Sequence, residues 1–160
     1  MKRIGYDTYD CILGRLYIVV SENGVENVFL SEDEFNEYNH IEKIDKDENL
    51  CKDAIKQMSE YFNKKRKDFE LPLNIKTTDF RKHVYEELLK IPYGETRSYS
   101  DIARAINNEK AVRAVGQANR LNKIPIIIPC HRVIGKSGKM VGYAGDKISI
   151  KEILLELESK

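Results

Sequence analysis

Apolar runs separated by a short polar turn stand out in the first thirty positions of the chain. The runs LGRLYIVV (13–20) and VENVFL (25–30) are rich in branched and aromatic residues, a pattern typical of β-strands. Between them lies Ser21-Glu22-Asn23-Gly24, which ends in Asn-Gly, a pair favoured in hairpin turns. The pattern therefore predicts a small antiparallel sheet near the N-terminus.

Three further segments complete the first half of the chain. The acidic stretch 31–49 is expected to be a surface connection with some strand in it. Apolar positions then recur at helical spacing from Leu50 to Phe62 and predict a helix followed by a basic cluster at 64–67. A cationic end suits the helix dipole, so that cluster needs no functional explanation. LPLNI (71–75) predicts a last short strand.

The second half is predicted to be helical. Thr78 or Asp79 is expected to cap a first helix, and Ser100 a short one over 101–106. A basic helix over 109–120 follows after a polar turn. Two short helices joined in this way have the outline of a helix-turn-helix, although any helical hairpin has the same pattern.

The last segments close the second half. IPIIIP (124–129) predicts an extended apolar segment, and an apolar face from Ile150 to Leu157 predicts a final helix ending near Glu158. The fold class is thus α+β, with two predicted lobes. Residues 1–76 form an N-terminal α/β lobe with a small antiparallel sheet and helix. Residues 77–160 form a helical lobe with the helix-turn-helix.

The net charge of +1 hides an uneven distribution of charge along the chain. Residues 1–75 carry 11 basic and 16 acidic side chains, whereas residues 76–160 carry 16 basic and 10 acidic ones. Within 97–139 there are nine basic and two acidic residues. Such a basic segment favours a polyanionic partner, although charge alone is equally compatible with a solvated helix face.

Cysteine usage and hydropathy narrow the class of protein further. The three cysteines, Cys11, Cys51 and Cys130, are an odd number, and no CxxC or HxxxH pair indicates a zinc cage. We therefore expect no structural disulfide, no metal and no cofactor. No apolar run approaches the ~20 residues of a membrane span, so a soluble cytoplasmic protein is expected.

Cys130 is the strongest candidate for chemistry, because it lies in Pro129-Cys130-His131-Arg132 directly after the apolar segment. Most lone cysteines are small buried hydrophobic residues. Here a histidine and an arginine follow, and a nearby base and cation favour the nucleophilic thiolate. Neighbours in an extended chain point to opposite sides, so contact between Cys130 and His131 requires an irregular backbone or a bridging water.

At this point the sequence shows a family resemblance. PCHRVIG, preceded by RAVGQANRLNKIPIII and followed by GYAG, resembles the active-site region of the methylated-DNA–protein-cysteine methyltransferases, the 6-O-alkylguanine-DNA alkyltransferases. The upstream IPYGETRSYSDIA and the closing KEILLELE fit the same family. The resemblance covers about residues 80–158, half of the chain, and the N-terminal half adds only a compatible outline.

The resemblance implies a role for each matching residue. Cys130 is the alkyl acceptor, His131 is its base through a water, and Glu158 orients the imidazole. Asn122 ties the helix-turn-helix to the active-site loop, and Tyr99 presses on the DNA backbone and donates to the flipped base. Arg113 fills the gap left in the base stack. Further implied DNA contacts are Tyr99, Ala114, Gly116, Arg120 and Arg132, and implied substrate contacts are Cys130, Val133, Tyr143 and Ala144.

The implied reaction moves an alkyl group from 6-O-methylguanine in double-stranded DNA to Cys130, once per molecule, with 4-O-methylthymine as a second candidate substrate. A target carbon on a base edge is inaccessible inside a duplex, so the nucleotide must be flipped out. Binding through the minor groove, with little base readout, and a monomeric protein are expected.

Several positions depart from the usual family pattern. Lys123 stands where a proline is common and Tyr85 where a tryptophan is frequent. Ala144 replaces a serine and Asp146 a glycine, which leaves the range of accepted alkyl groups open. Residues 1–75 contain no cysteine–histidine set like the zinc site of some relatives.

Three other classes of protein compete with this interpretation. A lesion-binding helix-turn-helix protein without transfer activity is the nearest alternative, but such relatives lack the acceptor cysteine. A helix-turn-helix regulator would leave the PCHR motif unexplained. A Cys-His-Glu hydrolase would turn over its substrate repeatedly, and mass spectrometry after incubation with methylated DNA separates all of these.

Overall fold

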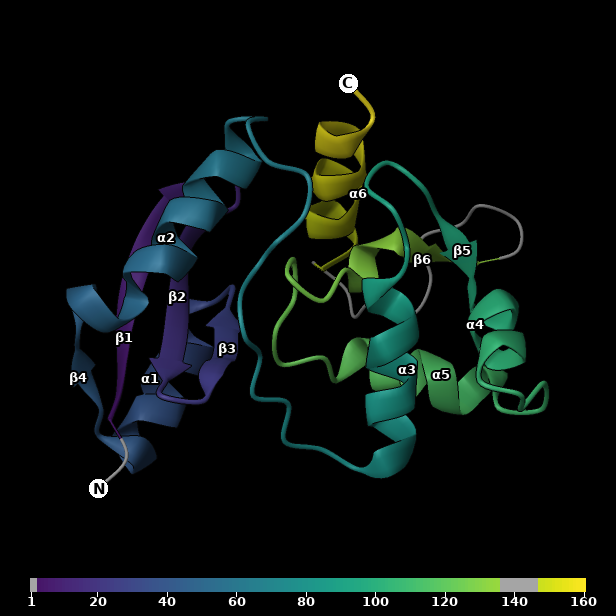
Figure 1. The fold of residues 1–160 in the computed structure, drawn as a ribbon, viewed down its shortest axis with the longest axis horizontal. Helices are drawn as coiled ribbons and strands as arrows, with labels where there is room; N and C mark the ends of the chain where they lie inside the picture. Colours follow the sequence, from purple (N-terminus) through teal and green to yellow (C-terminus); the bar gives the residue numbers. More distant parts are fainter. Residues whose placement is uncertain (1–2, 136–146) are drawn as a thin grey trace. The chain divides into compact units, whose positions relative to one another are not determined.

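The computed structural model describes residues 3–135 and 147–160 (Figure 1). By internal contacts the chain divides into two compact units, Met1–Lys76 and Thr77–Lys160. The first contains a sheet with helices and the second is mainly helical, so the predicted α+β class is confirmed.

The N-terminal unit is built on a four-stranded sheet in the order β3-β2-β1-β4. β1 (Ile4–Cys11), β2 (Gly14–Ser21) and β3 (Gly24–Phe29) are antiparallel, and the short β4 (Asp45–Lys46) adds a parallel edge beside β1. The Asn-Gly turn joins β2 to β3 as the sequence predicted. Gly24 has φ of +123°, and a Cβ there would lie 2.4 Å from the Pro72 carbonyl oxygen, so only glycine fits.

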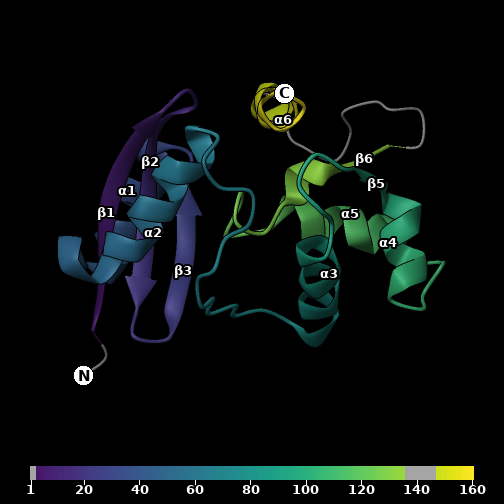
Figure 2. The same cartoon turned by 45° about the horizontal axis from the view of Figure 1, so that its top comes forward.

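Two helices cover the faces of this sheet, α1 (Glu32–Glu42) and α2 (Glu48–Phe62) (Figure 2). α1 buries Phe35 against Tyr17 and Val19 of β2. α2 buries one apolar stripe of its own, Cys51, Ala54, Met58 and Tyr61. Because both faces are covered, the central strand β2 is buried along most of its length.

Two predictions for this unit were wrong. The stretch expected to be a surface connection with some strand in it does contain β4, but it is mostly α1, which begins where the Ser31 hydroxyl accepts a hydrogen bond from the Glu34 amide. Three acidic residues in its first turn suit the positive end of the helix dipole. The predicted strand over 71–75 is reduced to a single bridge between Leu73 and Val25, since Pro72 has no amide proton to donate.

The C-terminal unit contains α3 (Asp79–Leu89), β5 (Arg97–Ser98), α4 (Tyr99–Ala105), α5 (Val112–Arg120), the 3-10 turn η1 (Cys130–Arg132), β6 (Val133–Ile134) and α6 (Lys147–Glu158). Apolar side chains of α3, α4 and α5 form its core, namely Val84, Leu88, Ile102, Ala103, Val115 and Ala118. The Tyr85 hydroxyl donates to the Ala118 carbonyl at 2.7 Å and ties α3 to α5.

α4 and α5 are the predicted helix-turn-helix pair and lie in contact (Figure 1). Two details of the prediction were wrong. α4 is capped by Ser98 rather than Ser100, because Asp101 completes a reciprocal capping box with Ser98. α5 begins only at Val112, after a turn in which Asn107 adopts φ of +58°, a conformation that asparagine tolerates.

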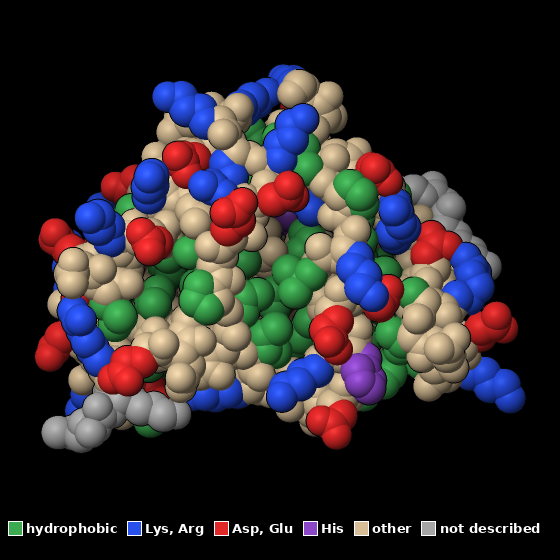
Figure 3. Space-filling model, in the orientation of Figure 1, with side chains coloured by type: hydrophobic (Ala, Val, Ile, Leu, Met, Phe, Trp, Pro, Cys, Tyr) green, Lys and Arg blue, Asp and Glu red, His purple; other side chains and the backbone are tan. Residues whose placement is uncertain are grey.

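Charged side chains of both signs are interspersed on the face of the units seen in Figure 3. The basic excess of the second half therefore forms no continuous positive area on that face. Among the helices that the structure describes, none has the length and apolar character to cross a membrane.

Candidate active site around Cys130

A tight turn brings the chain from α5 to Cys130. The Ile128 amide donates to the Ile124 carbonyl at 2.9 Å, and Ile126 has φ of +76°. This conformation is unusual for a β-branched residue and stores local strain. The segment predicted to be extended is thus a compact turn, and its five residues 124–128 are buried.

The side chain of Asn122 stabilises this turn by hydrogen bonds to both of its ends. Its Nδ2 donates to the Ile128 carbonyl at 2.9 Å, and its Oδ1 accepts from the Ile124 amide at 2.9 Å. Because Asn122 comes just after Leu121, the C-cap of α5, its amide joins the end of that helix to the segment before Cys130, the geometry expected of a linking residue.

Cys130 opens η1 and is 2% exposed. Its carbonyl accepts from the Val133 amide and from Asn119 Nδ2, the latter at 3.2 Å. Directly after η1, β6 pairs with β5 in parallel, which fixes the chain on the C-terminal side of that turn. A base contact to the Cys130 carbonyl, which the family resemblance implies, would have to share an oxygen that already accepts two donors.

His131 is fully buried and contacts Glu158 through Nε2 at 2.7 Å. An ionised carboxylate can only accept, so Nε2 carries the proton and Nδ1 is left as the basic nitrogen. Within the described residues Nδ1 has no hydrogen-bond partner. Burial lowers the pKa of His131, although the hydrogen bond and charge of Glu158 raise it. The lowered pKa favours the neutral imidazole, which can accept a proton.

Glu158 receives three further hydrogen bonds. Arg132 donates to its two oxygens from Nε at 2.8 Å and Nη2 at 3.0 Å, and the Gly94 amide donates at 3.2 Å. Arg132 Nη1 also donates to the Ile91 carbonyl at 2.7 Å, and its guanidinium lies 5.7 Å from the Tyr93 ring centroid. The network fixes the carboxylate against His131.

The expectation that Arg132 contacts DNA does not fit this geometry. The residue is 6% exposed, and its guanidinium is committed to Glu158 and the Ile91 carbonyl. Reaching a phosphate would leave the buried Glu158 carboxylate without its cation, which is costly. Arg132 therefore belongs to the support of the site.

Tyr99, the first residue of α4, is 8% exposed, and burial raises the pKa of its hydroxyl to about 12. Lys151 Nζ lies 3.4 Å from this hydroxyl oxygen. Lys151 is 0% exposed, and burial lowers its pKa to about 8. Sequence reasoning missed both Lys151 and Asn119. The only available signal was a lysine inside the apolar face of the closing helix.

The predicted DNA-contacting residues of α5 share an accessible face. Arg113, Ala114 and Arg120 are exposed, and Gly116 is partly buried with open space where a side chain would be. The α5 N-terminus has no side-chain cap, which leaves its amides available to an anion. Two predicted substrate contacts, Tyr143 and Ala144, lie outside the described residues; Val133 is described and is buried.

The other two cysteines have different surroundings. Cys51 is buried in α2 with Sγ 3.8 Å from the carbonyl oxygens of Gly5 and Ile18, and burial raises its pKa to about 12. Cys11 is partly buried, and burial raises its pKa also. Both environments disfavour the thiolate. Over residues 3–135 and 147–160 no group of three or more potential metal ligands comes together.

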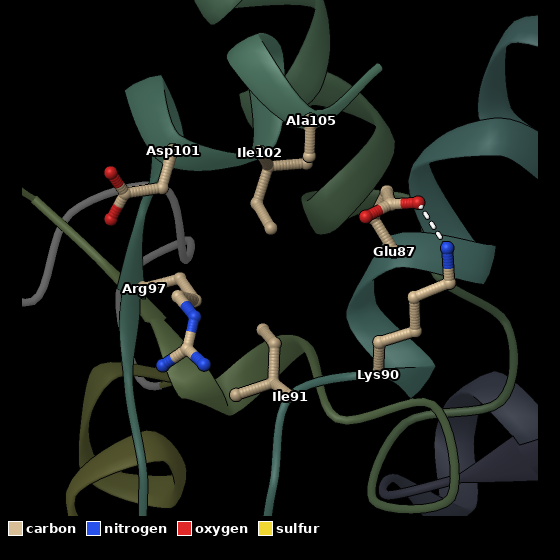
Figure 4. Close-up of a pocket in the computed structure, with 7 residues that line it drawn as sticks. All are labelled: Glu87, Lys90, Ile91, Arg97, Asp101, Ile102 and Ala105. Carbon is tan, nitrogen blue, oxygen red and sulfur yellow. Dashed lines mark hydrogen bonds and ion pairs between the residues drawn. The ribbon is translucent and has the colours of Figure 1, made fainter.

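A separate pocket of about 480 Å³ lies between α3, β5 and α4 and does not include Cys130. Ile91 and Ile102 point into it from opposite sides (Figure 4). Its charged side chains already have partners, since Lys90 pairs with Glu87 at 2.8 Å and Asp101 pairs with Arg104. We assign no ligand to this pocket.

Two family models, for two domains of the same kind of protein, match the two halves of this chain. Residues 79–160 match the family model for the DNA binding domain of 6-O-methylguanine DNA methyltransferase, and residues 4–75 match the model for its ribonuclease-like domain. The chain is 46% identical over 156 residues to the constitutive methylated-DNA–protein-cysteine methyltransferase of Bacillus subtilis, covering 96% of this chain and 94% of that protein. It is 52% identical over 107 residues to the Methanosarcina barkeri methylated-DNA–protein-cysteine methyltransferase, covering 67% of each.

Solved structures are similar as well. The Mycobacterium tuberculosis O6-methylguanine methyltransferase superposes with a TM-score of 0.87 at 38% identity, covering 98% of this chain and 93% of that one. The M. tuberculosis OGT in complex with DNA superposes with a TM-score of 0.84 at 40% identity, covering 97% and 92%.

Proposed function

The chain belongs to the 6-O-methylguanine DNA methyltransferase family, and from that premise we propose that it repairs alkylated DNA by transferring the alkyl group to its own Cys130. It acts as a methylated-DNA–protein-cysteine S-methyltransferase on DNA that carries alkylated guanine. The observation that carries the choice of acceptor is the placement of Cys130 directly before a buried His131 whose Nε2 lies 2.7 Å from a Glu158 carboxylate oxygen.

The residues of the site supply each part of the reaction. His131 Nδ1 takes the thiol proton, through a water as the resemblance implies, and the thiolate sulfur attacks the alkyl carbon. An S–C bond forms, the C–O6 bond breaks, and the electron pair of that bond leaves with the guanine. The C–S bond of the resulting thioether does not break again, because a thiolate is a poor leaving group from an alkyl carbon, so each molecule reacts once and no cofactor is consumed.

Recognition of DNA is assigned to the exposed face of α5. Arg113, Ala114 and Arg120 are accessible there. We propose that Arg113, near the start of α5, fills the gap that a flipped nucleotide leaves. Filling that gap offsets part of the few kcal/mol that flipping costs. We propose minor-groove binding by a monomer. A cytoplasmic location is proposed because reducing conditions keep the acceptor thiol available.

Mass spectrometry tests the assignment of the acceptor. After incubation with a duplex containing 6-O-methylguanine, the protein should gain about 14 Da, one methyl in place of one hydrogen, on the peptide that contains Cys130. Cys130→Ser should bind the duplex and gain nothing, because a serine hydroxyl ionises far less readily than a thiol. Cys11 and Cys51 are internal controls and should stay unmodified.

The same experiment decides between transfer and the alternative of lesion binding alone. Binding without any gain of mass would favour a helix-turn-helix protein that recognises the lesion without repairing it. Methyl on Cys11 or Cys51, or release of more than one guanine per molecule, would reject Cys130 as a single-use acceptor. A second duplex with 4-O-methylthymine tests that candidate substrate.

A further inference from the structure

Two buried side-chain atoms have no hydrogen-bond partner within the described residues, His131 Nδ1 and Asn119 Oδ1. The proposed reaction uses the first, which receives the thiol proton. The second belongs to a side chain of α5 that is 1% exposed. A buried acceptor without a donor costs free energy, so folded proteins rarely keep one that has no use. The reaction as proposed leaves Asn119 Oδ1 without a role.

The contact between Asn119 and Cys130 fixes which way the amide points. Nδ2 of Asn119 donates to the Cys130 carbonyl oxygen at 3.2 Å. Exchanging the two amide atoms would place Oδ1 against that carbonyl, and neither oxygen has a proton to donate. Because Oδ1 and Nδ2 are bonded to the same carbon, Oδ1 lies close to the acceptor cysteine as well.

The Cys130 carbonyl itself has little capacity for another donor. It already accepts from the Val133 amide and from Asn119 Nδ2, and a carbonyl oxygen has two lone pairs. A substrate N–H group that enters this site therefore finds, in Asn119 Oδ1, a neighbouring acceptor whose lone pairs are unused.

The alkylated base supplies a matching donor. In 6-O-methylguanine the ring nitrogens N1, N3 and N7 carry lone pairs and no proton, and N9 is bonded to the sugar. The only N–H bonds are those of the 2-amino group. This group and the methylated oxygen flank N1 on the same ring, so a base whose methyl carbon faces the Cys130 sulfur brings its amino group into the same site. By contrast, 4-O-methylthymine in DNA has no N–H bond.

We propose that Asn119 Oδ1 accepts a hydrogen bond from the 2-amino group of the flipped alkylguanine, which makes Asn119 a substrate-binding residue that determines which base is repaired. This proposal deepens the proposed function and rests on it. Nδ2 orients the amide on the Cys130 carbonyl, and Oδ1 contacts the base. The side chain thereby selects guanine lesions over lesions that lack the amino group, 4-O-methylthymine among them.

Two single-stranded oligonucleotides of the same sequence isolate this contact. One carries 6-O-methylguanine, and the other carries 6-O-methylhypoxanthine, in which hydrogen replaces the 2-amino group. Neither lesion has a base-pairing partner to leave, so the cost of unpairing does not enter the comparison. Single-turnover methylation of Cys130 in the full-length protein is measured with each oligonucleotide by mass spectrometry. The readout is the ratio of the two rate constants.

The unmodified protein should react about tenfold faster with the guanine lesion, the effect of one neutral hydrogen bond. Asn119→Leu should bring the ratio to within about twofold of one. The Nδ2 contact with Cys130 is lost toward both substrates alike, so a general slowing cannot imitate this result. Asn119→Ala removes the same oxygen with less bulk and should give the same ratio.

The matched control is Asn36→Leu, the same substitution at an exposed position of α1, which should keep the ratio of the unmodified protein. With duplex substrates, the preference for 6-O-methylguanine over 4-O-methylthymine should narrow about tenfold in Asn119→Leu, because the lost acceptor served only the guanine.

Three results would overturn the proposal. One is equal rates with the two oligonucleotides in the unmodified protein, a measurement that needs no variant. Another is a ratio that stays near its original value in folded Asn119→Leu or Asn119→Ala. The third is a preference for guanine over thymine lesions that does not narrow in either variant. If the unmodified protein transferred no methyl group from 6-O-methylguanine at all, the proposed function would be rejected, and this inference with it.

Discussion

Glu158 is the residue on which the most contacts of the candidate site converge. It accepts from His131, twice from Arg132 and from the Gly94 amide, and it is 5% exposed. Buried charges of this kind are stable only as a set, because removal of one partner leaves the others uncompensated. The same carboxylate therefore supports both the chemistry and the local fold.

Glu158→Gln tests both contributions at once. The neutral amide removes the charge that makes His131 a good base, so transfer to Cys130 should slow by about 100-fold. Loss of the anion beside buried Arg132 should lower the free energy of unfolding by about 3 kcal/mol. Single-turnover rates and urea unfolding measure the two effects, with binding of the methylated duplex as the control. A normal rate in a folded Glu158→Gln protein would remove Glu158 from the base assembly.

Lys151 should weaken the fold that contains it. Its pKa falls from 10.5 in the unfolded chain to about 8 in the folded protein, so the folded state binds fewer protons between these values. Stability is therefore lowest below pH 8, rises as the pH increases from about 8 to 10.5, and is constant above. The cost at neutral pH is at most about 3 kcal/mol.

Lys151→Met removes this cost, because methionine fills similar space without a charge. The variant should melt at a higher temperature than the unmodified protein at pH 7, and the difference should disappear by about pH 10.5. Thermal unfolding followed across this pH range makes the comparison. If Lys151→Met were less stable than the unmodified protein at pH 7, the interactions of the Lys151 ammonium inside the fold would have to offset its loss of hydration fully.

Residue-scale prediction from sequence succeeded where a motif carried the information. Cys130 and His131 were singled out from the Pro-Cys-His-Arg motif and Glu158 from the family resemblance, and the structure brings His131 and Glu158 into contact. Asn119 and Lys151 were missed, because an asparagine in a helix and a lysine in a helical pattern are normally solvent-exposed. Which face of α6 is buried is decided by tertiary packing, and the face chosen includes Lys151 and Glu158 as well as Leu154.

At the scale of elements, long periodic segments were predicted well and weakly periodic ones were not. The β2–β3 hairpin follows two β-rich apolar runs joined by an Asn-Gly turn, and α2 follows a clear helical spacing of apolar residues. α1 was missed because only Phe35 of its eleven residues is buried, so its apolar period is weak. The segment before Cys130 was predicted to be extended because side-chain hydrogen bonds from Asn122, invisible in the hydrophobic pattern, set its turn.

Gly116 of α5 offers a test of DNA contact, because substitution by alanine should make the protein more stable and its binding to DNA weaker. A Cβ added at Gly116 would meet no atom within 4 Å, so Gly116→Ala should fit without strain. Alanine should stabilise the helix by about 0.5–1 kcal/mol. If the DNA backbone approaches this position closely, affinity for the duplex should fall about tenfold, since a methyl group takes the space of a close contact.

The readouts for Gly116→Ala are thermal unfolding, duplex binding and reaction with free 6-O-methylguanine. The last should be unchanged, because the free base needs no contact with α5. A more stable protein with unaltered duplex affinity would place Gly116 outside the DNA interface.

At the scale of the whole molecule, charge is distributed unevenly between the two halves of the sequence. The overall balance is +1, yet residues 76–160 carry 16 basic and 10 acidic side chains. Whole-chain charge therefore gave no indication of a DNA partner, and only its division along the sequence did. The family resemblance was confirmed over both units, including the N-terminal one where the sequence offered only an outline.

Affinity for DNA should depend steeply on salt and weakly on sequence. Each phosphate neutralised by an arginine or lysine releases counterions, so the logarithm of the binding constant should fall linearly with the logarithm of salt concentration. Titrations of two unrelated duplexes between low and physiological salt measure the slope. Equal slopes for both are expected, and a slope near zero would mean that phosphate contacts do not dominate binding.

Because the His131–Glu158–Arg132 network is buried, its charges and the charges on the protein surface should respond differently to added salt. Added salt screens surface charges beyond a Debye length of about 8 Å at physiological ionic strength, but it screens buried charge pairs much less. Encounter with DNA is therefore tunable by ionic strength, whereas the chemical step inside a formed complex is not. Salt concentration should therefore change the rate at which the protein associates with damaged DNA without changing the rate of alkyl transfer from a lesion that is already bound.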